Sequence, residues 1–121
     1  MSATKSLLSI VELGGYPNFT SLYEQAGYRV QTVTTARKAI SWLKKNRVDV
    51  IVAEFNFQSD FRDRTSSLES ILATVQKYPD TRLIALYDKE QKHQLARLQA
   101  VFPDILPLEF PVEEQALRAL L

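Results

Sequence analysis

Two carboxylates that close short apolar segments are the first candidates for chemistry in this sequence. Glu12 follows the segment SLLSIV, and Glu54 follows DVIVA. If the two segments form adjacent strands, both side chains lie at the same edge of a sheet. Close carboxylates attract a cation, and hard cations such as Mg²⁺ and Ca²⁺ prefer oxygen ligands. A weak cation site and a water-filled acidic depression are both consistent with this pattern.

The elements that must position these carboxylates alternate along the chain. Short runs rich in β-branched residues are followed by segments with helical periodicity, which predicts five βα units. The expected strands span residues 6–12, 28–33, 48–55, 82–88 and 104–110, and the expected helices span residues 19–26, 36–46, 66–78, 89–102 and 112–121. Thr34 or Thr35 is the expected N-cap of the second helix, and Gly27 is the expected left-handed stop of the first.

Alternating βα units imply a parallel sheet, because right-handed crossovers place the helices on its two faces. The expected architecture is therefore an α/β three-layer sandwich, with the apolar run 48–55 as a central strand covered on both sides. In such a sheet the functional crevice lies beyond the carboxyl ends of the strands. Glu12, Glu54, Tyr87 and Phe110 occupy these ends and form the candidate site.

Length and composition limit the classes of protein to which this chain can belong. The 121 residues fit one domain, residues 1–121. Hydrophobic residues make up 45% and charged residues 24% of the chain, which argues against disorder. The net charge of +1 provides no field that would attract nucleic acid or a membrane. Cysteine is absent, which excludes disulfides and thiolate catalysis, and the apolar run LLSIVEL is too short to span a bilayer. We expect a cytoplasmic protein.

The segments IVEL, DVIVAEFN, DTRLIALYD and PLEFP at the strand ends resemble the receiver domain of two-component response regulators, over nearly the whole chain. AGYRV and KAISWL are similar to the family's usual first helix end, second strand and second helix. The resemblance implies a CheY-like, flavodoxin-like (βα)5 fold with strand order 2-1-3-4-5. It also implies a role in signalling through a protein partner.

In that family, two acids after the first strand hold Mg²⁺, and an aspartate that ends the third strand accepts the phosphoryl group. The resemblance places Glu12 at the first acid, but Leu13 replaces the second. Glu54 takes the phosphoacceptor position, and Asn56 stands where a backbone carbonyl reaches the metal. Glu54 is then either a constitutive substitute for a phosphorylated or metal-bound aspartate, or a carboxylate that only ends a strand in a solvated or hydrogen-bonded state.

Four further positions concern the groups that contact and report the phosphoryl group in the family. Tyr87 replaces the Ser or Thr that ends the fourth strand, and Phe110 replaces the Lys that ends the fifth. Pro111 retains the proline after that lysine, and the Phe110–Pro111 bond is compatible with the family's cis form. Pro107 stands at the switch aromatic, where proline suits an edge strand.

These substitutions predict a degenerate receiver, or pseudo-receiver. Phosphoryl transfer depends on positioning and on neutralisation of negative charge by Mg²⁺ and a cation, and Leu13 and Phe110 remove a metal ligand and that cation. We therefore expect no enzyme activity and no Mg²⁺ or other cofactor, and a protein-protein interaction module that works without phosphorylation. The alternative is a receiver-like domain regulated by a cation or small ligand at Glu12 and Glu54. A flavin-binding enzyme is a third class, although GxGxxG and Walker patterns are absent.

The expected partner surface is that of receivers, formed by the fourth helix, the fifth strand and the fifth helix, and a homodimer through it is a further expectation. Leu117, Leu120 and Leu121 surround Arg118 in the last helix. If exposed, these leucines indicate an interaction patch, and otherwise they pack on the sheet. The cations of RKAISWLKKNR flank an apolar stripe, so we expect a solvated basic face and no nucleic-acid site.

Overall fold

The computed structural model describes residues 5–11, 19–54, 67–78 and 80–121. Its strands are β1 (Lys5–Ile10), β2 (Tyr28–Val33), β3 (Val50–Glu54), β4 (Arg82–Tyr87) and β5 (Leu106–Glu109). Its helices are α1 (Thr20–Gln25), α2 (Ala36–Leu43), α3 (Ser67–Val75), α4 (Lys92–Val101) and α5 (Glu114–Leu120), and a short 3-10 helix, η1 (Lys89–Gln91), precedes α4. The five predicted βα units are confirmed.

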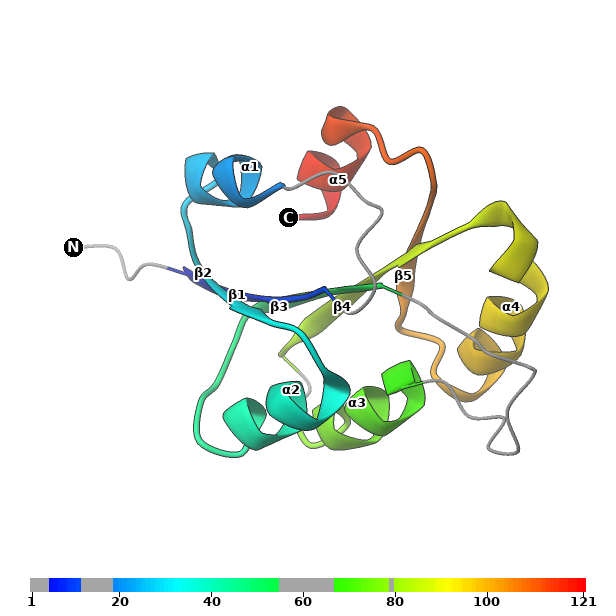
Figure 1. Ribbon diagram of the computed structural model, residues 1–121, viewed down its shortest axis with the longest axis horizontal. Coiled ribbons are helices and arrows are strands. Elements are labelled where there is room, and N and C mark those ends of the chain that lie inside the picture. The colour runs from blue at the N-terminus through cyan, green and yellow to red at the C-terminus, as the bar shows by residue number, and fades with distance from the viewer. Residues whose placement is uncertain (1–4, 12–18, 55–66, 79) are drawn as a thin grey trace.

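All strand pairs are parallel, and the order in the sheet is β2-β1-β3-β4-β5, as predicted. Helices α1 and α5 cover one face, and α2, α3 and α4 cover the other, so the protein is a three-layer sandwich (Figure 1). Within the described ranges, no helix is both long enough and apolar enough to cross a membrane.

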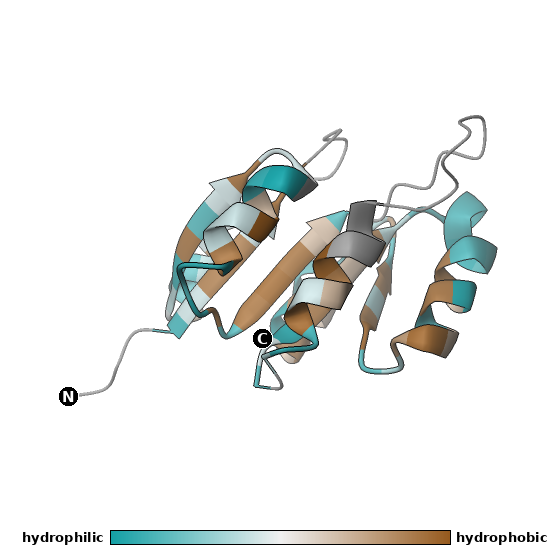
Figure 2. Cartoon of the chain, turned by 90° about the horizontal axis from the view of Figure 1, so that it is seen from below, coloured by the Kyte–Doolittle hydropathy of each residue, from teal (hydrophilic) through white to brown (hydrophobic). Residues whose placement is uncertain are grey.

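The alternation of side chains along the central strands produces two hydrophobic clusters, one on each face of the sheet. Leu7 and Val52 contribute to the cluster under α1 and α5, whereas Leu8 and Ile51 contribute to the cluster under α2, α3 and α4. Every residue of β3 is buried, in agreement with the prediction of a central strand. Figure 2 shows the hydrophobic residues gathered along the middle of the sheet. The core therefore fixes the carboxyl end of β3.

Local signals in the sequence set several helix boundaries. Thr35 is the N-cap of α2, and its hydroxyl accepts a hydrogen bond of 3.1 Å from Lys38 N. Gly27, at φ +96°, stops α1 in the left-handed region that favours glycine. Helix α2 ends at Leu43 and not at Asn46, because Asn46 Nδ2 donates to the carbonyl oxygen of Trp42 at 2.9 Å and closes the last turn.

Candidate functional site

Glu54 ends β3 and is only 4% exposed, which does not fit the interpretation of a solvated strand end. The alternation along β3 puts it on the same face as Val52, towards α1 and α5. In the strand register it pairs with Leu86 of β4. Burial of a carboxylate is costly unless polar groups compensate it. Glu54 is therefore a carboxylate of the protein interior and does not end β3 in solvent.

A cavity of about 310 Å³ lies beside Glu54, between α1 and the carboxyl ends of β1, β2 and β3. Phe19, Tyr23 and Val52 give it apolar walls, and Ser9 and Thr32 add hydroxyl groups. Ser9 is itself 9% exposed and is one of two buried polar residues among those described, together with Glu54. The cavity thus combines aromatic rings, hydroxyls and a carboxylate.

Tyr87 ends β4 and is directed to the opposite face of the sheet, where it belongs to the cluster under α2, α3 and α4. Its phenol donates a hydrogen bond of 3.3 Å to Glu109 Oε1 on β5. Burial, the negative charge of Glu109 and this hydrogen bond together raise the pKa of Tyr87 above its ordinary value. The phenol is therefore neutral near pH 7 and is bonded to a carboxylate.

The end of β5 carries the remaining described site residues. Phe110 N donates to the carbonyl oxygen of Tyr87 at 2.7 Å, which continues the pairing of β4 and β5. The Phe110–Pro111 peptide bond is cis, as the resemblance led us to expect. The Phe110 side chain is 40% exposed, and so does not fill the interior. Pro107 lies in β5, an edge strand of the sheet, as predicted.

Three predicted site residues, Glu12, Leu13 and Asn56, lie outside the described residues. The approach of Glu12 to Glu54 therefore stays a prediction. Among the residues that the structure describes, no group of three or more His, Cys, Asp or Glu side chains is placed to hold a metal ion.

The packing of α5 decides whether its leucines are exposed or lie against the sheet. Leu117 is completely buried, and Leu120 and Leu121 are half-buried against the cluster under α1 and α5. The leucines therefore pack onto the sheet and form no exposed patch. The exposed large hydrophobic residues of the described chain are instead Val101, at 66%, Phe110, at 40%, and Val11, at 38%.

Comparisons with known proteins rest on structure and not on sequence. No protein-family model and no curated protein matches the chain significantly. A response regulator receiver protein from Sinorhizobium medicae superimposes with a TM-score of 0.74 at 20% identity, over 94% of this chain and 88% of that one. Chemotaxis response regulator CheY4 of Vibrio cholerae gives 0.73 at 20% identity, over 98% and 97%. A receiver domain protein from Clostridium thermocellum gives 0.71 at 18%, over 95% and 89%.

The chain has the receiver fold. Identity of 20% or less shows the fold alone, so the chemistry of the site depends on the residues present. In this receiver fold the residues that end β3, β4 and β5 are Glu54, Tyr87 and Glu109. They bring two carboxyl groups and a phenol to the carboxyl edge of the sheet, and the residues directly after β4 and β5 are Asp88 and Phe110.

Sequence reasoning did not single out Glu109, although it is the partner of Tyr87. The two residues are opposite each other in the register of β4 and β5. A register of this kind follows from the length of the turns and from packing, which a single sequence does not specify. Ser9 and Thr32 were missed for a related reason, since they become wall residues only when α1 is placed over β1 and β2.

Proposed function

We propose that this chain is a receiver-fold module of a signalling pathway that binds a protein partner without accepting a phosphoryl group and without enzyme activity. The hydrogen bond from Tyr87 to Glu109 carries the proposal. It occupies the hydroxyl that ends β4, where the resemblance expects a group that contacts the phosphoryl oxygens. An acid takes the place of the phosphate as the acceptor.

The charges at the strand ends support the same proposal. Phosphoryl transfer needs Mg²⁺ and a fixed cation to neutralise the charge that develops on the transferred group. The residues that end β4 and β5 are Tyr87 and Glu109, and Phe110 follows β5, so none of these three side chains supplies a fixed cation. Glu54 is also one methylene longer than aspartate, and a misplacement of about 1 Å costs roughly a hundredfold in a positioned reaction.

The partner surface that we propose runs over α4, β5 and residues 110–113, which precede α5. Val101 and Phe110 are the exposed large hydrophobic residues there, and both are available for burial in a complex. A homodimer through the same surface is the other outcome. Analytical ultracentrifugation of the wild-type chain and of Phe110→Ser separates self-association from binding to a different protein.

The decisive experiment treats the ¹⁵N-labelled chain with beryllofluoride and Mg²⁺, and follows the amide signals. We expect no saturable change at Glu54, Leu86 or Tyr87, and no adduct by mass spectrometry after incubation with acetyl phosphate. An active receiver treated in parallel shows that the reagents work. A stable adduct on Glu54, abolished by Glu54→Gln, would refute the proposal.

A second candidate is regulation by a cation or small ligand at Glu12 and Glu54. It is favoured by the cavity of about 310 Å³ beside Glu54, which has the volume of a small-molecule site. Titration of Mg²⁺ or Ca²⁺ into the wild-type chain tests the cation. Saturable shifts around Val52 and Glu54 that disappear in Glu54→Gln support this candidate, and an unchanged spectrum contradicts it for cations.

A further inference from the structure

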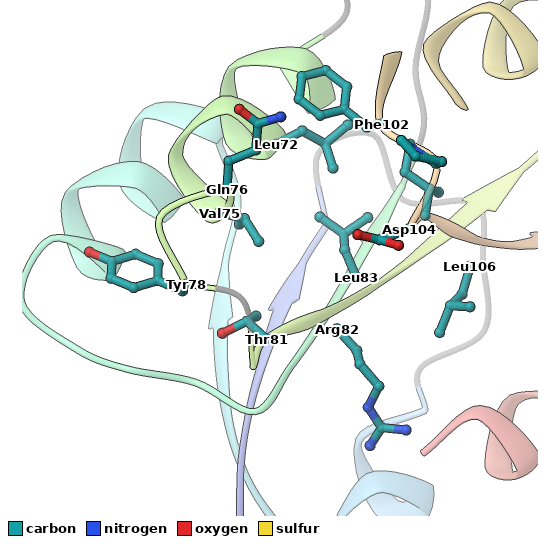
Figure 3. A pocket seen from close by; sticks show the side chains of 12 residues that line it. Leu72, Val75, Gln76, Tyr78, Thr81, Arg82, Leu83, Phe102, Asp104 and Leu106 are labelled. Atoms are coloured by element: carbon teal, nitrogen blue, oxygen red, sulfur yellow. The ribbon is translucent and has the colours of Figure 1, made fainter. Parts of the chain in front are cut away.

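We propose that a groove between α3 and α4 binds a small apolar cation, such as an arylalkylamine. The groove has a volume of about 490 Å³ and lies where β4 begins and α3 and α4 end (Figure 3). Because the strands are parallel, it is at the opposite end of the sheet from Glu54, and it is independent of the function proposed above. Cavities of about 300–1,000 Å³ are the size that binds small molecules.

Apolar side chains form the walls of the groove. Leu72 and Val75 come from α3, Leu83 from β4 and Ile105 from the turn before β5, and all four are buried. Phe102, which follows α4, is half-buried and completes the wall. Helix α3 packs closely against α2 and stands farther from α4, which leaves the space open (Figure 1).

Two of the hydroxyl groups around the groove already have acceptors elsewhere. Tyr78 Oη donates to the carbonyl oxygen of Leu43 at 3.3 Å. Thr81 Oγ1 donates to the carbonyl oxygen of Val48 at 2.6 Å. The first bond links the segment after α3 to the end of α2, and the second links the residue before β4 to the segment before β3, so neither proton is available to an anionic ligand.

The two charged residues that line the groove have different orientations. The Arg82 guanidinium turns away from it and donates to the main-chain oxygens of Leu120 and Leu121 at 3.0 and 2.8 Å. The Asp104 side chain lines the groove, and its carboxylate points toward Leu83 (Figure 3). Among the side chains that line the groove, the charge offered to a ligand is therefore negative.

This combination defines the class of ligand. An aromatic or aliphatic body would bury its surface against Leu72, Val75 and Leu83, and an ammonium group would form a charge-assisted hydrogen bond with Asp104. An anion of the same shape would be repelled by the Asp104 carboxylate and would gain no charge-assisted hydrogen bond from it. The groove should therefore discriminate between ligands by the sign of their charge.

A matched pair of probes tests the proposal on the full ¹⁵N-labelled chain. We expect 2-phenylethylammonium to produce saturable shifts of the amide signals of Leu83, Asp104 and Ile105, and 3-phenylpropionate to produce none. Equal shifts with both probes, saturable shifts confined to another region, or no saturable shift with either would overturn the assignment.

Three variants complete the experiment. Asp104→Asn should weaken binding of the cation by about tenfold or more, since it removes a hydrogen bond to a charged group. Val75→Phe should abolish binding because the ring fills the groove, and Glu24→Gln on α1 is the control for loss of one exposed acid on the opposite face. Asp104 is exposed, so Asp104→Asn should fold even if Val75→Phe does not. Wild-type affinity in Asp104→Asn, or equal losses in Asp104→Asn and Glu24→Gln, would contradict the proposal.

Discussion

Arg82 Nη2, at the start of β4, donates a hydrogen bond to the main-chain oxygen of Leu121, 2.8 Å away. Tyr28 Oη, at the start of β2, donates to the same oxygen at 2.6 Å. Strands β2 and β4, which flank β1 and β3 in the sheet, therefore both bond to the residue that follows α5. This contact fixes α5 on the face of the sheet towards which Glu54 is directed, and Tyr87 is directed to the other face.

The first prediction concerns this contact. Arg82→Ala should lower the free energy of unfolding by about 1–2 kcal/mol, because it removes hydrogen bonds from a charged donor at an exposed position. Urea denaturation measures the change. Arg29→Ala, on the exposed side of β2, is the control and should cost less. Equal losses in the two variants would show that the contact with α5 does not stabilise the fold.

The docking of α5 itself gives a second prediction. Leu117 is completely buried in the cluster under α1 and α5, and Leu117→Ala should cost about 2–5 kcal/mol of unfolding free energy through lost burial and a residual cavity. Leu120 is only half-buried, so Leu120→Ala should cost less in the same denaturation assay. A loss at Leu120 that matches the loss at Leu117 would contradict the burial described for α5.

The start of α2 provides a third prediction with a neighbouring control. Thr35→Ala should lower the free energy of unfolding by about 1 kcal/mol, since the hydroxyl that accepts from Lys38 N is lost. Thr34→Ala changes an adjacent exposed threonine that is not the cap, and it should have a smaller effect. Thermal unfolding by circular dichroism compares the two. The reverse order of effects would move the cap to Thr34.

The raised pKa values of two tyrosines predict how the free energy of unfolding depends on pH. Burial raises the pKa of Tyr23, and burial and Glu109 raise that of Tyr87, above the ordinary value of 10.0. The folded chain thus holds these protons more tightly than the unfolded chain, so the stabilisation is complete below pH 10 and is lost as the pH rises through the folded-state values.

We therefore expect the free energy of unfolding to fall above about pH 10, by up to ~1.4 kcal/mol per pH unit for each tyrosine. Denaturation of the wild-type chain and of the Tyr23→Phe/Tyr87→Phe double variant, from pH 9 upwards, measures the difference. The double variant should lose less stability at high pH. Parallel curves for the two proteins would contradict the prediction.

Much of the architecture could be predicted because its signals are local. The alternation of strand and helix patterns predicted the five units, and Gly27 and Thr35 marked helix boundaries that the structure confirms. The resemblance implied the strand order 2-1-3-4-5, and the sheet has this order. Local pattern and overall topology agree in this chain, as they do in sequences that specify a single fold.

The candidate site could be predicted only in part, because its contacts join distant segments. Tyr87 was identified as a strand end, but its bond to Glu109 depends on the register of β4 and β5. The burial of Glu54 depends on the placement of α1, and the groove at Asp104 depends on the spacing of α3 and α4. Such distances between elements are determined by side-chain packing over the whole domain.

Pro107 has a consequence for how molecules of this protein can assemble. Since Phe110 N bonds to the carbonyl oxygen of Tyr87, the alternation along β5 turns the backbone of Pro107 and Glu109 away from the sheet. Proline has no N–H, so the outer edge of this four-residue strand lacks a donor at its second position. A sixth strand from another chain would find an incomplete template, and growth of the sheet into a fibre is disfavoured at this edge.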